Sequence, residues 1–288
     1  MTNCNLCPRK CGVNRNLYKG YCGRKEKITV ARSALHFWEE PVISGTKGSG
    51  TVFFTGCSLR CSFCQNHEIS IENNEGCELE PNELSALFFK LIDEGAHNIN
   101  LVTPTHYADK IAEALRFKKL PVPVVYNCGG YERTETLELL EGLVDIYLPD
   151  FKYAEWELAK NLSNAEDYPD VAIKAVKEMR RQQPINIVNN GLMEKGVIIR
   201  HLILPLHTKN SIKVLNIIKE NFPDTPVSLM AQYTPIRDTG LKELDRKITK
   251  RELEKVREEM FRLELDGFIQ SRKSAEKDFI PDFNSFTF

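Results

Sequence analysis

The sequence predicts an α/β fold in which a parallel sheet is wrapped by helices. From residue 51 onward, short apolar or β-branched runs alternate with longer segments whose apolar residues recur at helical spacing. Such alternation produces parallel strands joined by helical crossovers. We count six strands, two fewer than in a closed eight-stranded barrel. The pattern alone leaves a partial barrel and an open doubly wound sheet as candidate architectures.

The elements follow in a regular order. Strands are expected at residues 51–55, 98–103, 122–127, 144–149, 197–204 and 227–233, and helices at 81–95, 107–120, 165–183 and 209–221. Pro81 stands at the start of the first helix and Gly95 just after its end, as is usual for helix boundaries. Thr249 and Glu252 form a capping box that opens a last amphipathic helix.

The composition is that of an ordinary globular protein. The chain has 288 residues, 42% hydrophobic and 27% charged, with a net charge of −1. This charge argues against nucleic acid or an anionic membrane as a partner. No apolar run approaches the roughly 18 residues that span a bilayer, and the N-terminus lacks an apolar signal region. We therefore expect a cytoplasmic protein with no membrane or nucleic-acid partner.

Three units are expected along the chain: a cysteine-rich extension (1–45), the barrel (46–269) and a tail (270–288). The extension carries Cys4, Cys7, Cys11 and Cys22 in a segment too short and polar to build a core. We expect these four cysteines to hold a metal, either structural zinc or a second iron–sulfur cluster. An unmetallated arm is the third alternative.

Residues 34–45 connect the extension to the barrel. His36, Glu39 and Glu40 lie close together there and could perform acid–base chemistry. Two glutamates before a proline are more often a solvated turn, and this is the interpretation that we favour.

The chemistry is concentrated after the first strand. Gly56 ends this strand, and Cys57, Cys61 and Cys64 follow within eight residues. Three thiolates leave a four-iron cluster one ligand short, because such clusters normally take four cysteines. A missing protein ligand is a position open to another molecule. Zinc is the competing interpretation, although it prefers four ligands.

The spacing Cys-x-x-x-Cys-x-aromatic-Cys, with Phe63 as the aromatic residue, resembles the signature of radical S-adenosylmethionine (SAM) enzymes. The run GTKGSGTVFFTGCSLRCSFCQN, which ends at Asn66, is similar to the opening of pyruvate formate-lyase activating enzymes. The resemblance implies a partial (β/α)6 barrel and a [4Fe-4S] cluster whose open iron binds SAM. It also implies an external one-electron reductant, such as flavodoxin or ferredoxin, and cleavage of SAM to a 5′-deoxyadenosyl radical.

In both architectures ligands bind at the carboxyl ends of the strands. The second strand ends at Thr103, Thr105 and His106, where the related activating enzymes carry a Gly-Gly-Glu that holds the SAM amino group. Hydroxyl and carbonyl groups of the Thr-Pro-Thr segment would replace it here. His106 is a candidate for acid–base work and otherwise caps the following helix.

The third strand ends at Asn127 and Cys128, a segment similar to the Asn-Gly turn that faces the cofactor in the family. Cys128 is a candidate hydrogen donor or covalent site, although cysteine is also a common small buried residue. Cys77 lies in an expected polar loop and receives no role.

The last three strand ends supply charged and polar candidates. Asp150 and Lys152 resemble the Asp-x-Lys element whose lysine pairs with the SAM carboxylate in activating enzymes. Arg200 lies within an apolar strand and needs a partner, because a buried unpaired charge is very unfavourable; it is the best candidate for an anion clamp. Gln232 and Tyr233 would line the adenine or substrate pocket.

The sequence therefore predicts a radical SAM enzyme that abstracts hydrogen from an unknown substrate, either a glycyl-radical enzyme or a small molecule. An iron–sulfur carrier or sensor that binds SAM without turnover is the alternative, and a zinc-dependent interaction module is a third hypothesis. The tail carries Phe279, Phe283, Phe286 and Phe288 without regular periodicity, and either packs across the barrel or stays loose.

Overall fold

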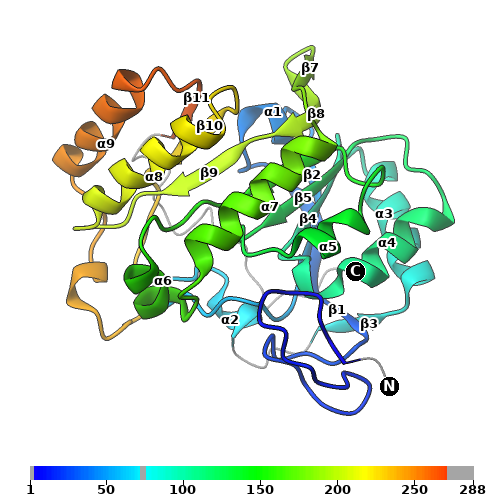
Figure 1. The fold of residues 1–288 in the computed structure, drawn as a ribbon. Helices are drawn as coiled ribbons and strands as arrows, with labels where there is room; N and C mark the ends of the chain where they lie inside the picture. The colour runs from blue at the N-terminus through cyan, green and yellow to red at the C-terminus, as the bar shows by residue number, and fades with distance from the viewer. Residues whose placement is uncertain (1–2, 72–75, 271–288) are drawn as a thin grey trace.

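Parallel strands form the centre of the molecule, in a computed structural model that describes residues 3–71 and 76–270. Helices pack on the outside of these strands (Figure 1). The parallel strands are β2 (Ser49–Phe54), β4 (Ile99–Val102), β5 (Val124–Cys128), β6 (Ile146–Pro149), β8 (Leu192–Val197), β9 (Ile199–Leu202), β10 (Val227–Met230) and β11 (Gly267–Ile269). The predicted α/β fold with a parallel sheet is confirmed.

The parallel strands are divided between two sheets that meet at one place. β2, β4, β5, β6 and β8 are neighbours in the first sheet, and β9, β10 and β11 form the second. Only Ile198 separates β8 from β9, and a parallel bridge between Asp150 and Arg200 joins the sheets there. The single strand expected at 197–204 is thus the end of β8 followed by β9. With these two strands taken together, six parallel strand positions run from β2 to β10, and β11 adds a short seventh.

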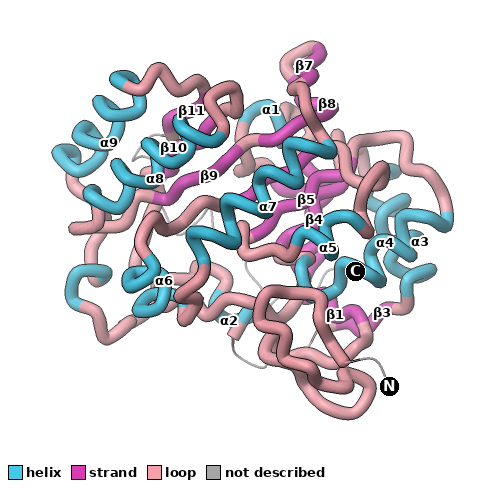
Figure 2. Tube along the Cα trace, in the orientation of Figure 1, coloured by secondary structure: helices cyan, strands magenta, loops and turns pink. Residues whose placement is uncertain are grey.

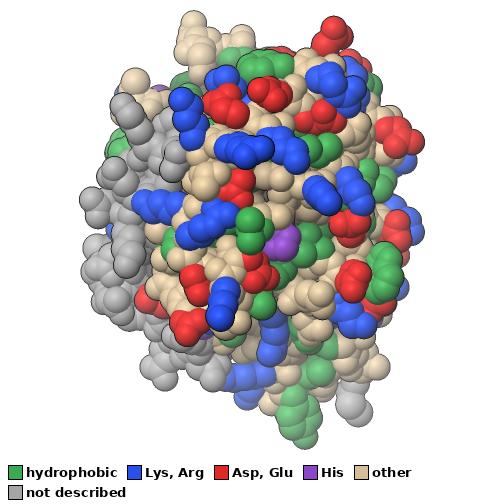
Figure 3. Space-filling view, turned by 90° about the vertical axis from the view of Figure 1, so that its left-hand side faces the viewer, with side chains coloured by type: hydrophobic (Ala, Val, Ile, Leu, Met, Phe, Trp, Pro, Cys, Tyr) green, Lys and Arg blue, Asp and Glu red, His purple; other side chains and the backbone are tan. Residues whose placement is uncertain are grey.

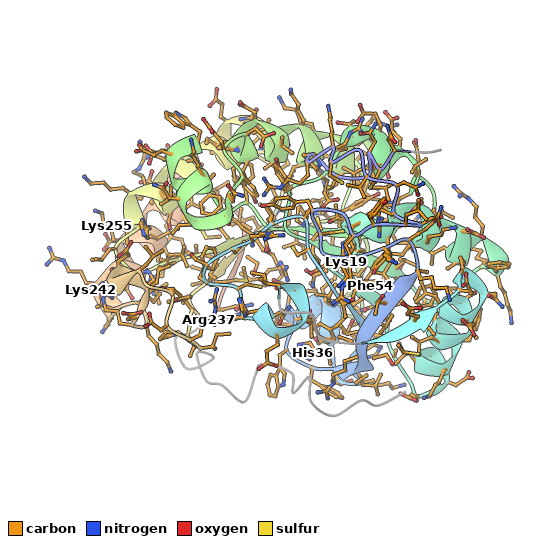
Figure 4. The ribbon with its side chains drawn as sticks, turned by 90° about the horizontal axis from the view of Figure 1, so that it is seen from below. Lys19, His36, Phe54, Arg237, Lys242 and Lys255 are labelled. Carbon is orange, nitrogen blue, oxygen red and sulfur yellow. The ribbon has the colours of Figure 1, made fainter. Side chains whose placement is uncertain are left out.

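Three strands that the sequence analysis missed pair antiparallel. β1 (Ile28–His36) lies beside β2, β3 (Cys77–Leu79) pairs with β1, and β7 (Ile187–Asn189) forms a hairpin with β8. The boundary expected at residue 45 places β1 in the extension, whereas the structure places it in the main sheet. Cys77, expected in a loop, belongs to β3. Figure 4 labels one residue of each strand in the first pair, His36 of β1 and Phe54 of β2.

The helices cover the outer face of the strands. They are α1 (Pro41–Ser44), α2 (His67–Ser70), α3 (Pro81–Asp93), α4 (Ala108–Phe117), α5 (Thr134–Glu138), α6 (Trp156–Ser163), α7 (Tyr168–Gln182), α8 (Thr208–Asn221) and α9 (Lys250–Arg262), with short 3-10 turns at Thr105–Tyr107 and Lys242–Leu244. The capping box of Thr249 and Glu252 opens α9 as expected. α3 buries Leu84, Phe88 and Leu91, each worth about 2 kcal/mol of apolar burial.

Residues 3–27 contain no helix or strand and lie below β1 and β3 (Figures 1 and 2). We call them the N-terminal segment. Side-chain and backbone hydrogen bonds fix it to the barrel: Arg9 Nε donates to the Ser58 carbonyl at 2.8 Å, and Thr136 Oγ1 donates to the Leu6 carbonyl at 2.8 Å. Contacts of this kind replace the secondary structure that the segment lacks.

The described surface is ordinary in charge. Basic and acidic side chains are interspersed on the face shown in Figure 3, in agreement with the net charge of −1. Of the helices in the described part of the chain, none has both the length and the apolar character needed to cross a bilayer. Residues 271–288, most of the expected tail, lie outside the described residues.

Candidate active site

A cavity of about 930 Å³ opens where the parallel strands end. Its volume lies within the range of small-molecule sites, about 300–1,000 Å³. Fifteen of the residues that the sequence analysis singled out line it: His36, Glu39, Cys57, Cys61, Phe63, Cys64, Asn66, Thr103, Thr105, Asn127, Cys128, Asp150, Lys152, Arg200 and Gln232. Residues from positions 57 to 232 of the chain therefore meet in one wall, as expected for the carboxyl ends of neighbouring parallel strands.

The cysteine loop begins at Gly56, immediately after β2 ends. Gly56 has φ +81°, and a Cβ atom there would lie 2.5 Å from the carbonyl oxygen of Cys22. Only glycine fits this close approach in a left-handed conformation. The backbone amide of Cys57 then donates to the same carbonyl at 3.3 Å. The loop therefore starts in direct contact with the N-terminal segment.

Hydrogen bonds orient the three thiols of the loop. The Leu59 amide donates to Cys57 Sγ at 3.3 Å, and the Ser163 hydroxyl donates to Cys61 Sγ at 2.9 Å. Cys64 Sγ lies 3.3 Å from the Ser70 hydroxyl. Arg237, labelled in Figure 4, donates to the Ser62 carbonyl within the loop at 2.8 Å.

The chemistry of these thiols suits a metal cluster. Burial raises the pKa of Cys57 and of Cys61, and charge interactions among the three cysteines raise both further, whereas Lys152 lowers the pKa of Cys61. A metal removes this penalty because it binds the thiolate directly. Three sulfur donors facing a cavity fit an iron–sulfur cluster with one position left to a bound molecule.

A charged cluster lies in the same wall. Asp150 Oδ2 accepts from Lys152 Nζ at 2.5 Å, and Asp150 Oδ1 accepts from Arg200 Nε at 3.0 Å. Burial raises the pKa of Asp150, but the charges of Arg200 and Lys152 outweigh burial and lower it overall. Conversely, the charge of Asp150 outweighs burial and raises the pKa of Lys152. Asp150 is therefore ionised, and Lys152 and Arg200 both carry a positive charge.

Glu39 completes this cluster, and here the favoured interpretation of a solvated turn is wrong. Glu39 Oε2 accepts from Arg200 Nη1 at 3.2 Å, and Glu39 Oε1 accepts from the side-chain amides of Asn100 and Asn127 at 3.0 and 3.2 Å. Glu40 is 1% exposed. Burial raises the pKa of both glutamates, against the charge of Arg200. The pair turns inward because Arg200 supplies the missing cation.

The end of β4 is strained. Thr103 has φ +60°, a left-handed conformation that a β-branched residue rarely adopts. Its backbone amide donates to the Asn127 carbonyl at 2.9 Å, which ties the ends of β4 and β5 together. Thr103 thus takes up a backbone geometry that glycine adopts more readily.

His106 does not reach the cavity. It is buried behind the cysteine loop, where its Nε2 hydrogen-bonds the Thr55 carbonyl at 2.7 Å. Burial and the charge of Arg15 lower the pKa of His106 to about 3. These contacts support a structural role for the imidazole.

Glu132 was missed by the sequence analysis. It lies just behind the cavity wall, 2% exposed, and accepts hydrogen bonds from the hydroxyls of Thr105 and Tyr126 at 2.7 and 3.1 Å. The available signal was its place four residues after the end of β5, within the turn that contains Gly129 and Gly130.

The four N-terminal cysteines form a second group, outside the cavity. Cys7 and Cys22 are buried. Burial raises the pKa of Cys7 to about 12, and charge interactions with Cys22 and Cys4 raise it further. Cys11 interacts with Cys4 by a side-chain hydrogen bond. Within residues 3–71 and 76–270, no three cysteine, histidine or acidic side chains are arranged to hold a single metal ion, and this finding includes the three cysteines of the cavity.

The fold and the site together define a class of iron–sulfur enzyme, and comparison with known proteins agrees. The model of the radical SAM superfamily matches residues 51–203. The uncharacterized protein MJ0674 of Methanocaldococcus jannaschii is 32% identical over 276 residues, which cover 92% of this chain and 76% of the relative. The chain belongs to the radical SAM superfamily, whose members cleave SAM at an iron–sulfur cluster.

Solved structures of low sequence identity share the fold. SuiB of Streptococcus suis, bound to the precursor peptide SuiA, superimposes with a TM-score of 0.52 at 17% identity, over 75% of this chain and 46% of the SuiB chain. Spore photoproduct lyase gives a TM-score of 0.52 at 9% identity, over 75% of this chain and 74% of the lyase. This chain thus spans less than half of SuiB.

Proposed function

We propose that this protein binds SAM in the cavity, cleaves it reductively and directs the resulting radical to abstract hydrogen from a substrate. One observation carries the proposal: three cysteines with the radical SAM spacing line the same cavity as a charged cluster at the strand ends. Cys57, Cys61 and Cys64 would hold the [4Fe-4S] cluster. When bound, the cluster supplies the electron that cleaves SAM.

The side chains of the wall would orient SAM. Lys152 lines the cavity and its charge acts on Cys57 and Cys61, so it would meet the SAM carboxylate. Asp150 would hold Lys152 in place, since the two form a 2.5 Å ion pair. Arg200 would position Asp150 and Glu39. Five further residues of the wall would contact the rest of the cofactor: Phe63, Asn66, Thr103, Thr105 and Gln232.

The substrate is either the backbone of a glycyl-radical enzyme, as for the activating enzymes, or a small molecule. Phe37 and Trp38 lie at the cavity and are 47% and 55% exposed. Large exposed aromatic side chains beside a site are typical of surfaces that contact a partner. A one-electron reductant of the flavodoxin or ferredoxin class would supply the electron, and a partner of this class would be met in the cytoplasm.

The N-terminal cysteines would hold a second metal, either zinc or iron–sulfur. Cys4, Cys7, Cys11 and Cys22 are all sulfur donors, and Cys4 interacts with each of the other three. Counting iron, zinc and sulfide in anaerobically purified protein distinguishes the two metals. A Cys11→Ser variant that keeps the full metal content would contradict the assignment.

The decisive experiment is an anaerobic assay of 5′-deoxyadenosine formed from SAM by the reconstituted, reduced protein. Turnover that disappears in Cys61→Ala and persists in Cys77→Ala supports a radical SAM enzyme. A loaded, reducible cluster that binds SAM without cleaving it, with several reductants, would favour an electron carrier or sensor instead.

A further inference from the structure

A buried carboxyl group with no cation among its partners in the described chain lies one side chain behind the cavity wall. Glu132 accepts hydrogen bonds from the Thr105 hydroxyl at 2.7 Å and the Tyr126 hydroxyl at 3.1 Å. The Cys128 thiol, four residues earlier in the chain, also interacts with this carboxyl: each group shifts the pKa of the other. Thr105 and Cys128 both line the cavity. Any molecule that fills the cavity therefore lies against groups that touch Glu132 directly.

The hydrogen-bond partners of Glu132 within the described chain are neutral. Burial raises the pKa of Glu132 to about 7, and the hydrogen bonds from Thr105 and Tyr126 and the interaction with Cys128 offset burial only in part. A buried carboxyl without a counter-charge keeps its proton to higher pH. Near neutral pH, Glu132 can therefore hold or release a proton. Asp150 differs, because Arg200 and Lys152 keep it ionised.

Glu132 is the uncompensated charge that faces Cys128. Asp150 and Arg200 also act on this thiol, from the ends of β6 and β9, but they are paired with each other. Two tyrosines, Tyr126 of β5 and Tyr147 of β6, face the same group, and burial raises the pKa of both, which keeps them neutral. From the N-terminal segment, Cys7 interacts with Glu132 by charge alone.

We propose that Cys128 delivers a hydrogen atom to the substrate radical and that Glu132 holds the proton that restores the thiol. This inference rests on the proposed function. The S–H bond of Cys128 breaks and a C–H bond forms, so the substrate radical is reduced and the sulfur becomes a thiyl radical. One electron from the external reductant and the proton of Glu132 re-form the thiol. Glu132 then regains a proton from solvent.

The pair also favours one class of substrate. A hydrogen donor in the cavity wall would quench a carbon radical where it forms. A glycyl-radical enzyme needs the opposite, because its radical must persist after activation. Cys128 with Glu132 therefore assigns the protein to substrates whose product is closed-shell, such as a small molecule or a modified peptide. Glu132 acts on the substrate only through Cys128, as the group that returns the proton to the sulfur.

The coupling is tested by the pH dependence of Cys128 alkylation in the full chain, purified anaerobically with the metal that it carries. Iodoacetamide reacts with the thiolate, and peptide mass spectrometry resolves the rate at Cys128 from the rates at other cysteines. An ionised Glu132 raises the pKa of the thiol, so the logarithm of the rate should rise with pH, flatten near pH 7 and rise again. Above this flattening, the alkylation rate should be about threefold to tenfold lower than a straight extrapolation from low pH, since one pKa unit is a factor of ten.

Glu132→Gln removes the charge and keeps the volume. The variant should show a straight profile without the flattening, and Cys128 should react about threefold to tenfold faster above pH 8. A purely structural role would change the rate equally at all pH values. Glu178→Gln is the matched control, because Glu178 is 6% exposed but pairs with Arg181 on α7. A flattening that persists in Glu132→Gln, or is absent from the wild type, would overturn the coupling.

Hydrogen delivery needs a second measurement, made with SAM and reductant in deuterium oxide. Thiol deuterium exchanges with solvent, so 5′-deoxyadenosine formed without substrate should be partly monodeuterated, and Cys128→Ala should lower that share at least about threefold. An unchanged share would overturn delivery by Cys128. If the wild type forms no 5′-deoxyadenosine, the proposed function fails and delivery fails with it. The alkylation profile still decides the proton coupling.

Discussion

Two cysteine-bearing segments touch each other, yet the fold positions them by different means. The cavity loop follows β2 directly, so the end of a buried strand fixes Cys57, and Cys61 and Cys64 follow in the wall beside Lys152. The N-terminal segment has no regular structure and is held by side chains that reach carbonyl groups, above all Arg9 and Arg15. A site on a strand end inherits the rigidity of the sheet, whereas a site on such a segment depends on a few contacts.

The largest expected difference concerns turnover. Cys61→Ser should lower 5′-deoxyadenosine formation at least about 100-fold, because a cluster with two protein ligands is not retained. Cys11→Ser, in the N-terminal segment, should lower it by less than about tenfold, since that cysteine lies outside the cavity. The anaerobic SAM cleavage assay measures both, and Cys77→Ser serves as the control. Equal losses of 5′-deoxyadenosine formation in the two variants would contradict the expected difference between the two segments.

The second prediction concerns the buried charges on the cavity side. Asp150→Ala removes the carboxylate that pairs with both Lys152 and Arg200, which should lower the free energy of unfolding by about 3 kcal/mol. Urea denaturation measures this loss. Asp224→Ala, at an exposed turn, should change stability by less than about 0.5 kcal/mol. A comparable loss in both variants would show that the charge cluster contributes nothing specific to stability.

The contact between the segments depends on Arg9. Its guanidinium donates to the carbonyls of Ser58, Ser163 and Asn164 and lies over the Tyr21 ring at 4.2 Å. Arg9→Ala should loosen the N-terminal segment by about 2 kcal/mol. Amide exchange there should become about thirtyfold faster, since 1.4 kcal/mol is a factor of ten.

Hydrogen exchange followed by mass spectrometry checks this prediction, with the exposed Lys25→Ala as the control. Exchange in β2 and β4 should not change, because the sheet holds these strands independently. Unchanged exchange at residues 3–27 in Arg9→Ala would mean that other contacts suffice to dock the segment.

The smallest expected effect concerns backbone strain, which occurs both in the cavity wall and in the N-terminal segment. Thr103 in the cavity wall and Lys10 in the N-terminal segment both have left-handed backbones, with φ +60° and +42°. Glycine adopts this conformation freely, but it loses more conformational entropy on folding. Relief of the strain at Thr103 should slightly outweigh this entropy loss. Thr103→Gly should then raise the midpoint of thermal unfolding by the equivalent of less than about 1 kcal/mol. Lys10→Gly should gain less, because lysine is not β-branched; a larger gain would contradict the strain at Thr103.

Much of the fold could be predicted because it depends on local pattern. Alternating apolar runs and helical spacing located the six parallel strand positions, and the capping box located α9. β1 was missed because its partner, β2, is not apparent from the pattern of β1 itself, and β11 has three residues, too few to show a period. Cys77 was placed in a loop for a related reason, since β3 is equally short and pairs only with β1.

The residues of the candidate site likewise include some that the sequence could predict and some that it could not. The rule that ligands meet strand ends, together with the cysteine spacing and the resemblance to activating enzymes, located many residues of the cavity wall. Glu39 was judged to be solvated because its cation, Arg200, lies 161 residues further along the chain. Glu132 gave little local signal, since its burial depends on partners from η1 (Thr105–Tyr107) and β5. Burial of a charge is decided by long-range contacts, which one sequence does not display.

The way in which the N-terminal segment is held also sets the timing of its assembly during synthesis. Arg9 reaches the carbonyl of Asn164, 155 residues later in the chain. At about 5–20 residues per second, a ribosome needs roughly 8–30 s to make that stretch. Until then Cys4, Cys7, Cys11 and Cys22 are exposed on a nascent chain. The metal binding proposed for these cysteines would therefore compete with their oxidation before the barrel that they pack against has been made.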